Sequence, residues 1–288
     1  MACVDVHQHI WPREFVAALR ARRLPPRLEG DTLRVAGEPP CHIDLGSDPL
    51  RSRLAVLDAA GIDVGLISLQ PTLGIDSLSE GERAELVRLW QEGVSELAAE
   101  SAGRLVPLAA DPSDERFRGA VLGAEALLAL EEHGGVFDAL QRRGAFLFVH
   151  PGPASTPDGA PPWWPAVVDY TAQMQAAYAN WLAQGAERWP DLRVVFAILA
   201  GGAPIQLERL HSRGFGSRMT LHPNVFFDIA SYGRRALELS IQAFGVEQLV
   251  FGTDIPVITA EQSLRAARGF GDSVAKYILE TNPSQLIA

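Results

Sequence analysis

The chain has 288 residues, of which 47% are hydrophobic and 21% are charged, and its formal net charge at pH 7 is -10. This composition is typical of a folded protein with a large core and argues against a disordered chain. The acidic balance also argues against a nucleic acid as partner, because binding a polyanion needs a clustered basic face.

The two cysteines, Cys3 and Cys41, are too few for a disulfide framework, which is typical of small secreted proteins. No stretch approaches 18 uninterrupted apolar residues, and the start of the chain lacks the basic segment of a signal peptide. We therefore expect a cytoplasmic protein without a membrane partner.

Taken in chain order, short runs that are almost continuously apolar alternate with longer helical patterns. This alternation is typical of βα units around a parallel sheet whose strands are buried on both faces. The predicted strands are Ala2–His9, Val64–Gln70, Arg104–Ala110, Arg118–Ala124, Ala145–His150, Arg193–Leu199, Asn224–Ala230 and Gln248–Asp254. Eight such units predict an α/β protein, a (β/α)8 TIM barrel, with residues 1–288 forming a single domain.

Apolar residues spaced by three and four predict helices between several of these strands. They are expected at Arg51–Ala60, where Gly61 is a plausible C-cap, and at Gly81–Ala99, Tyr170–Arg188 and Arg234–Phe244. The link between the third and fourth strands, DPSDERF, is too short for a full helix. The predicted barrel is therefore slightly distorted.

Residues 24–47 interrupt the pattern after the first strand. Short alternating runs flank Gly30 and Asp31, a pair that is typical of a tight turn. This segment is predicted to be a β-hairpin inserted over the mouth of the barrel.

Catalytic side chains of such barrels gather at the carboxyl ends of the strands, so the polar residues that end the apolar runs are the candidates. The first run ends in His7-Gln8-His9, where strand alternation turns both imidazoles to one side. The fifth run ends in His150 and the eighth in Asp254. Three imidazoles and a carboxylate suit a borderline divalent cation such as zinc, manganese or iron.

Several strings resemble the amidohydrolase-2 branch of the amidohydrolase superfamily, which contains aminocarboxymuconate-semialdehyde decarboxylase and related decarboxylases and hydrolases. The resemblance covers nearly the whole chain and rests on VDVHQHIWP, FLFVHPGP, WPDLRVVFAILAGGAP, NVFFDIASYG, LVFGTDIP and ETNPSQLI. It implies a divalent metal, usually zinc, held by His7, His9, His150 and Asp254.

The resemblance also implies that Arg53 matches a position that holds a substrate carboxylate in the decarboxylases; the alternative is a charge on a helix surface. Trp11 and the pair Trp163-Trp164 are candidates for the lining of the substrate pocket. A homodimer is expected from the resemblance alone.

One position departs from the family pattern. Where the family usually has FAHxGG on the sixth strand, this chain has Ile198 in FAILAGG. The expected histidine handles the proton of the metal-bound water or of the decarboxylation, which an isoleucine cannot do. Three alternatives follow. Asp254 acts as the base, or His211 or His222 takes the place of the missing histidine, or the protein has lost the usual reaction.

The sequence therefore predicts a metal-dependent hydrolase or decarboxylase that acts on a small carboxylated, aromatic or unsaturated molecule, with Asp254 moving the proton. The alternative is a repurposed or catalytically impaired barrel that binds a small molecule or catalyses a non-hydrolytic step, and Ile198 is its main support.

Overall fold

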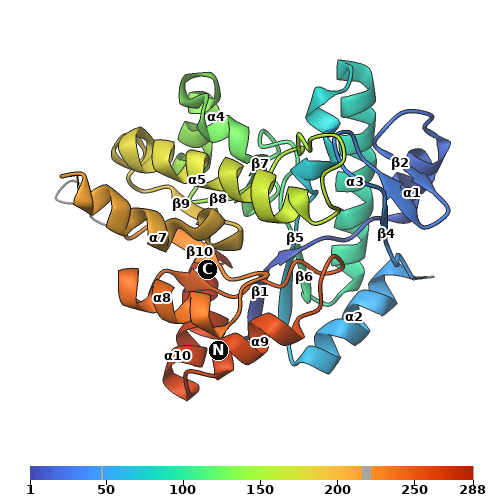
Figure 1. Ribbon diagram of the computed structural model, residues 1–288. Coiled ribbons are helices and arrows are strands. Elements are labelled where there is room, and N and C mark those ends of the chain that lie inside the picture. Colours follow the sequence, from blue (N-terminus) through green and yellow to red (C-terminus); the bar gives the residue numbers. More distant parts are fainter. Residues whose placement is uncertain (47, 216–221, 288) are drawn as a thin grey trace.

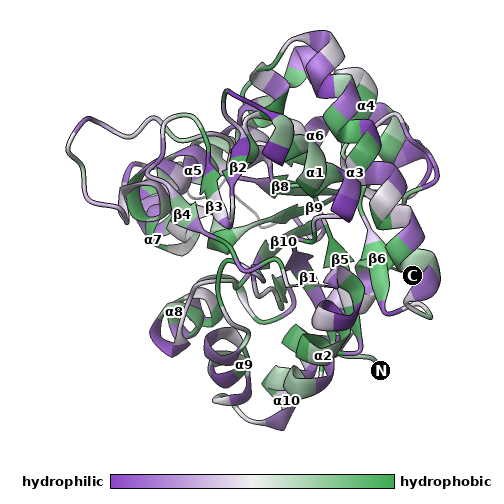
Figure 2. Ribbon diagram, turned by 90° about the vertical axis from the view of Figure 1, so that its right-hand side faces the viewer, coloured by the Kyte–Doolittle hydropathy of each residue, from purple (hydrophilic) through white to green (hydrophobic). Residues whose placement is uncertain are grey.

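The fold is built on parallel strands at the centre of the molecule, with helices around them (Figures 1 and 2). The computed structural model describes residues 1–46, 48–215 and 222–287. The central strands are β1 (Val4–Gln8), β5 (Val64–Ile67), β6 (Leu105–Pro107), β7 (Gly119–Gly123), β8 (Phe146–His150), β9 (Arg193–Phe196), β10 (Val225–Asp228) and β11 (Leu249–Val250).

These strands follow one another in chain order around a barrel. One ladder joins β1, β5 and β6, and another joins β7, β8, β9, β10 and β11, with parallel pairing throughout. Backbone hydrogen bonds bridge both seams: Ala109 N donates to the Gly119 carbonyl over 2.9 Å, and Val6 N donates to the Phe251 carbonyl over 2.9 Å. The predicted (β/α)8 TIM barrel is confirmed.

Each of the eight predicted runs contains a strand, although the strands are shorter than the runs. The largest difference is in the eighth run, where β11 stops at Val250. The backbone of Asp254 then takes a left-handed conformation with φ of 65°, which cannot continue a strand.

The helices are α1 (Arg13–Ala21), α2 (Pro49–Ala60), α3 (Glu80–Glu100), α4 (Leu130–Arg142), α5 (Tyr170–Asn180), α6 (Ala186–Arg188), α7 (Ile198–Ser212), α8 (Arg234–Phe244), α9 (Glu261–Arg268), α10 (Asp272–Lys276) and α11 (Asn282–Ile287). The predicted helices are found, and a π-helical turn, Trp181–Gly185, joins α5 to α6. Gly61 caps α2 with φ of 67°, as expected. The link between β6 and β7 contains no helix, which accounts for the predicted distortion.

The first turn of α7 is left-handed instead of right-handed. Ile198, Leu199 and Ala200 have φ of 47°, 49° and 48°. Left-handed backbone costs about 1–2 kcal/mol for each residue with a Cβ, so packing must hold this turn in place. Gly201 follows at φ of 66°, and an added Cβ there would lie 2.1 Å from the carbonyl oxygen of Thr171.

The insertion after β1 contains three short strands, β2 (Arg27–Glu29), β3 (Thr32–Arg34) and β4 (Cys41–His42), paired antiparallel in that order. Glu29 pairs with Thr32, so Gly30 and Asp31 make the expected turn. The sequence predicted a two-stranded hairpin, but β4 adds a third strand to it. Ser47, the last residue of the predicted segment, lies outside the described residues.

Apolar side chains fill the barrel and the space between strands and helices, including Phe146, Phe148, Val194, Phe196 and Phe227, all fully buried. In the ranges that the structure describes, no helix combines the length and apolar character needed to cross a membrane.

Candidate active site

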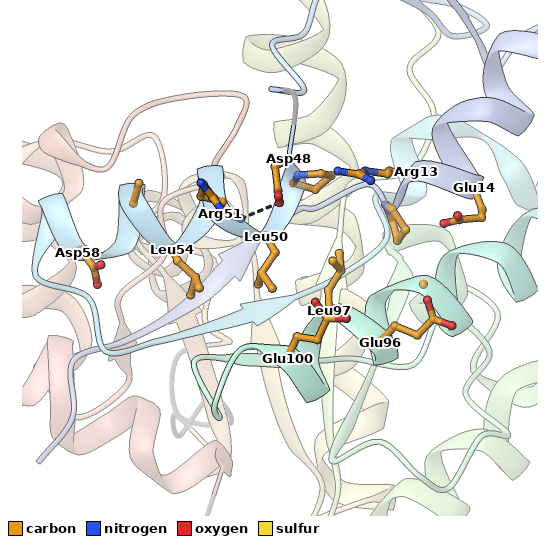
Figure 3. Close-up of a pocket in the computed structure, with 14 residues that line it drawn as sticks. Arg13, Glu14, Asp48, Leu50, Arg51, Leu54, Asp58, Glu96, Leu97 and Glu100 are labelled. Atoms are coloured by element: carbon orange, nitrogen blue, oxygen red, sulfur yellow. Dashed lines mark hydrogen bonds between the residues drawn. The ribbon is translucent and has the colours of Figure 1, made fainter.

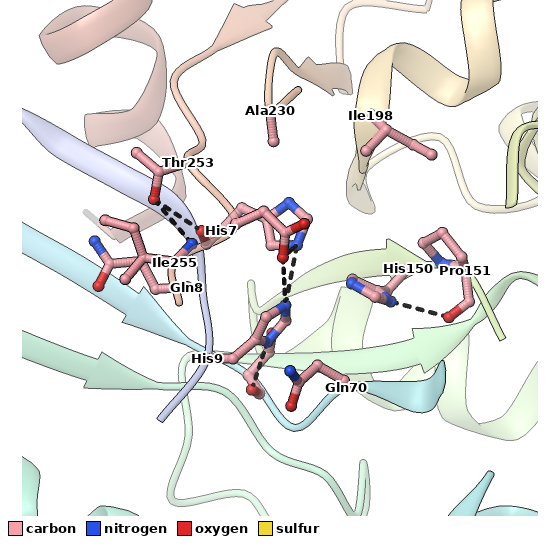
Figure 4. Close-up of polar contacts among 12 residues, drawn as sticks. His7, Gln8, His9, Gln70, His150, Pro151, Ile198, Ala230, Thr253 and Ile255 are labelled. Atoms are coloured by element: carbon pink, nitrogen blue, oxygen red, sulfur yellow. Dashed lines mark hydrogen bonds and ion pairs between the residues drawn. The ribbon is translucent and has the colours of Figure 1, made fainter. Parts of the chain in front are cut away.

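His7, His9, His150 and Asp254 lie together at the carboxyl ends of the strands. Each offers one ligand atom, and these atoms all lie within 4.8 Å of one another. Asp254 Oδ1 is 3.2 Å from His9 Nε2 and 3.5 Å from His7 Nε2. Figure 4 shows the three imidazoles around one space. The structure therefore brings together all four residues that the sequence predicted as metal ligands.

The other ring nitrogen of each histidine is held by an acceptor. His7 Nδ1 lies 2.6 Å from Asp228 Oδ2, His9 Nδ1 lies 3.0 Å from the Ser68 carbonyl oxygen, and His150 Nδ1 lies 2.9 Å from the Pro151 carbonyl oxygen. Acceptors of this kind fix the ring orientation of metal-binding histidines. All three rings can therefore offer Nε2 as a ligand.

The pKa shifts differ among the members of the cluster. Burial lowers the pKa of His9, and burial together with the nearby His7 and His9 lowers that of His150 well below its usual range. Burial disfavours a charged His7 as well, but Asp228 and Asp254 outweigh it and raise its pKa to about 9. Burial raises the pKa of Asp254, but charge interaction with His7 and the His9 hydrogen bond outweigh it, so the net shift is downward. His9 and His150 thus favour the neutral form that metal binding requires, whereas His7 has to release a proton when a cation binds to its Nε2.

Asp254 is positioned by a buried carboxylate beneath the cluster rather than by a strand. Asp5 accepts hydrogen bonds from Thr253 N and Oγ1, at 3.1 and 2.6 Å, and from His7 N at 3.1 Å. Asp254 N in turn donates to the His7 carbonyl over 2.8 Å. The loop after β11 is thus tied directly to β1, which corrects the expectation that Asp254 ends a strand.

A cavity of about 400 Å³ opens beside the cluster, between the segment directly after β1, helix α2 and the loop after β11. His9, Trp11, Arg53 and Ile255 are among its lining residues. Trp11 is buried and donates from Nε1 to Gln70 Oε1 over 2.7 Å. The structure therefore places two of the predicted substrate-binding residues on one cavity with a predicted metal ligand.

Arg53 is only 6% exposed, so its interpretation as a surface charge was wrong. Nη1 donates to Gln8 Oε1 over 2.8 Å, and Nη2 donates to the His9 carbonyl over 2.6 Å. No carboxylate of the described ranges, 1–46, 48–215 and 222–287, forms an ion pair with it. Burial lowers the pKa of Arg53 to about 10, which leaves it cationic at neutral pH.

Trp164 does not line this cavity. Its ring stacks on the exposed Trp163, and its Nε1 donates to Asp169 Oδ1 over 3.2 Å. The hydrogen bond to Asp169 and the stack on Trp163 hold the ring on the segment before α5. The expectation that Trp164 lines the pocket with Trp11 and Arg53 was therefore wrong for this cavity.

A larger groove of about 750 Å³ lies between α2 and α3 (Figure 3). Its charged lining residues include Arg13, Glu14, Asp48, Glu96 and Glu100. None of the four clustered residues lines it, so its size does not make it the candidate active site.

Ile198 lies on the left-handed turn at the edge of the cluster, on the side of His150 (Figure 4). Its backbone N is 3.4 Å from Asp228 Oδ2, the oxygen that holds His7. Neither proposed replacement is in the cluster. His211 is exposed near the end of α7, and His222 precedes β10, at the end of that strand opposite to Asp228.

Reasoning from the sequence missed Asp228, Asp5 and Gly252. Asp228 is a carboxylate inside the apolar run Asn224–Ala230, so a search for polar residues that end such runs passes over it, although a charged residue within a buried run is itself a signal. An added Cβ at Gly252 would lie 1.9 Å from Asp228 Oδ1, a requirement for glycine that only the packing of β10 against β11 reveals.

Comparisons with known proteins identify the family of the chain. The amidohydrolase family model matches residues 4–287. A 2-amino-3-carboxymuconate-6-semialdehyde decarboxylase of Dictyostelium discoideum is 24% identical over 170 residues, which are 53% of this chain and 47% of that protein. The match thus spans about half the length of the curated relative.

Among solved structures, the apo form of IDCase from Metarhizium anisopliae has a TM-score of 0.78 at 20% identity, covering 99% of this chain and 97% of that one. The 5-carboxyvanillate decarboxylase of Novosphingobium aromaticivorans, solved with manganese and 4-hydroxy-3-methoxy-5-nitrobenzoic acid, has a TM-score of 0.74 at 19% identity, covering 99% and 95%. These likenesses concern the fold, whereas the family model spans almost all of the sequence. The chain therefore belongs to the amidohydrolase family.

Proposed function

We propose that this protein is a metal-dependent decarboxylase of a small aromatic or unsaturated carboxylic acid. The observation that carries the proposal is the shared cavity. It brings Arg53, which is buried and has no carboxylate partner among the residues that the structure describes, next to His9 of the histidine and aspartate cluster. Both relatives with decarboxylase in their names support this choice over hydrolysis.

The four clustered side chains would hold the cation, which supplies Lewis-acid polarisation of a substrate oxygen. Arg53 pairs with a substrate carboxylate through charge-assisted hydrogen bonds. Asp254, the predicted catalytic residue, takes up a proton from solvent and passes it to the carbon that bears the leaving carboxylate. The carbon–carbon bond breaks, its electron pair stays with the substrate carbon that takes up the proton, and carbon dioxide leaves. Trp11 and Ile255 give the cavity apolar walls that suit an unsaturated ring.

Zinc is the metal we expect, with manganese and iron as alternatives, because three imidazoles and one carboxylate suit all three. The manganese of the carboxyvanillate enzyme supports a divalent cation at this kind of site. A cytoplasmic location and a homodimer stay predictions.

The alternative of a barrel that only binds or catalyses a different step depends on Ile198. It is not favoured, because the cluster of four metal-binding side chains, each imidazole with its own acceptor, is complete.

The test is release of carbon dioxide from a panel of hydroxybenzoates and unsaturated dicarboxylates by protein loaded with zinc or manganese. We expect turnover that requires metal and falls at least tenfold in Arg53→Met, because a hydrogen-bonded charge pair is lost. Arg51→Met is the matched control, since Arg51 is exposed on the same helix. Release of amine or alcohol without carbon dioxide would instead assign a hydrolase.

A further inference from the structure

Gln8, the last residue of β1, separates His7 from His9, and its side chain belongs to a buried polar network rather than to the cluster. Its Nε2 donates to Asp5 Oδ2 over 2.7 Å, and its Oε1 accepts from Arg53 Nη1 over 2.8 Å. Both Gln8 and Asp5 are fully buried. Asp5, Gln8 and Arg53 therefore form one continuous chain of hydrogen bonds.

The neighbouring strand leaves room for this amide. Gly65 of β5 pairs with Asp5 in the sheet, and an added Cβ there would lie 2.9 Å from Gln8 Oε1 and 3.1 Å from Nε2. A residue with a side chain at position 65 would push the amide out of this place. The Gln8 conformation is thus built by packing as well as by hydrogen bonds.

We propose that Gln8 is a positioning residue that aims the guanidinium of Arg53 at the substrate carboxylate. The proposal rests on the proposed function, because it needs Arg53 to bind that carboxylate. Two contacts at the carboxyl end of β1 hold the guanidinium: Gln8 Oε1 and the carbonyl of His9, the residue after the strand. Since His7 lies on β1 and His9 directly follows it, the anion-binding group and two of the clustered histidines share one support.

An amide is the group that fits this role. It donates to the Asp5 carboxylate and accepts from Arg53 at once, and it adds no charge of its own. A glutamate would neutralise Arg53 and face Asp5 with like charge. The neutral amide leaves the positive charge of Arg53 for a ligand in the cavity.

The experiment compares the affinity of metal-loaded protein for 2-hydroxybenzoate and for 2-hydroxybenzamide, a neutral analogue of the same shape, by calorimetry. We expect wild type to prefer the benzoate and Arg53→Met to lose the preference. Gln8→Met should weaken benzoate binding about tenfold and leave benzamide binding and metal content unchanged. In the Arg53→Met background, Gln8→Met should cause no further loss of benzoate affinity. Gln8→Glu keeps the shape of the side chain, so it tests the same loss if Gln8→Met does not fold.

Gln91→Met is the matched control. Gln91 is also a buried glutamine with two hydrogen bonds through its side-chain amide. Its Nε2 donates to Asp114 Oδ2 over 3.1 Å, and its Oε1 accepts from the backbone N of Asp111 over 2.6 Å. It lies on α3, outside the cavity, and should leave both affinities unchanged.

The outcomes separate the two proposals. If Arg53→Met loses the preference while both Gln8 variants keep it, the role of Gln8 is wrong and the carboxylate site stands. If wild type shows no preference, or Arg53→Met keeps it, the carboxylate site itself is wrong and the role of Gln8 fails with it. Loss of metal in both Gln8 variants would show that Gln8 supports the cluster rather than Arg53, which also overturns the proposal.

Discussion

Nδ1 of His7 lies 2.6 Å from Oδ2 of Asp228, and both side chains are completely shielded from solvent, 1% and 0% exposed. A carboxylate in this place orients the imidazole and raises its basicity toward a cation on Nε2. The same oxygen lies 3.4 Å from the backbone N of Ile198. Asp228 thus connects the cluster to the left-handed turn at the start of α7.

Asp228→Asn should therefore lower metal affinity about 10- to 100-fold while keeping the side-chain shape. Competition with a fluorescent zinc chelator measures this change. Asp191→Asn, an exposed aspartate before β9, is the control and should bind metal like wild type. Equal affinities in the two variants would contradict the role of Asp228.

His150→Ala removes one of the four grouped ligand atoms. We expect bound metal, measured by plasma mass spectrometry, to fall from near one equivalent to a small fraction. A chelator should lower the unfolding midpoint of wild type, because a bound metal stabilises only the folded state, and should leave that of His150→Ala unchanged. His211→Ala, exposed on α7, should keep both the metal and the chelator response.

Gly252→Ala should lose metal although glycine offers no ligand. The added Cβ would lie 1.9 Å from Asp228 Oδ1 and 2.8 Å from His7 Cβ, so Asp228 would have to leave its place against His7. Metal titration of the folded variant tests this. Gly135→Ala on α4, where nothing lies within 4 Å of the added Cβ, should bind metal normally; normal binding by Gly252→Ala as well would refute the prediction.

Ile198→His should raise the turnover of the proposed reaction about tenfold or more, because a well-placed general acid or base contributes about 10²- to 10⁴-fold. Histidine also tolerates left-handed backbone better than a β-branched residue, which favours folding at φ of 47°. Steady-state kinetics decide the point, with Ile198→Leu as the control. Equal turnover in both variants would mean that position 198 does not reach the substrate.

Ala102→Gly should raise the free energy of unfolding by about 1 kcal/mol, because exposed Ala102 has φ of 53° and glycine removes the left-handed penalty. Ala59→Gly in α2, also exposed, should lower it by about 1 kcal/mol through the poor helix propensity of glycine. Urea denaturation of both variants measures the two shifts. Shifts of the same sign would be inconsistent with a left-handed Ala102.

Much of the fold was determined by the sequence alone. Each apolar run, such as the one ending in His150, is too short for a helix and too apolar for an exposed strand, so a buried parallel strand is its only stable place. Once eight such strands close in chain order, the polar residues near their carboxyl ends must meet. That is why His7, His9, His150 and Asp254 could be predicted as one cluster.

Only the tertiary structure decided the surroundings of that cluster. The pair of His7 and Asp228 joins residues 221 positions apart, and the pair of Gln8 and Arg53 joins residues 45 positions apart. Such pairs depend on how β1 registers against its neighbours and on the close approach allowed by Gly65 and Gly252. The periodicity of a strand or helix shows which side of its own element a residue faces, but the residue it meets there is set by the packing of another element.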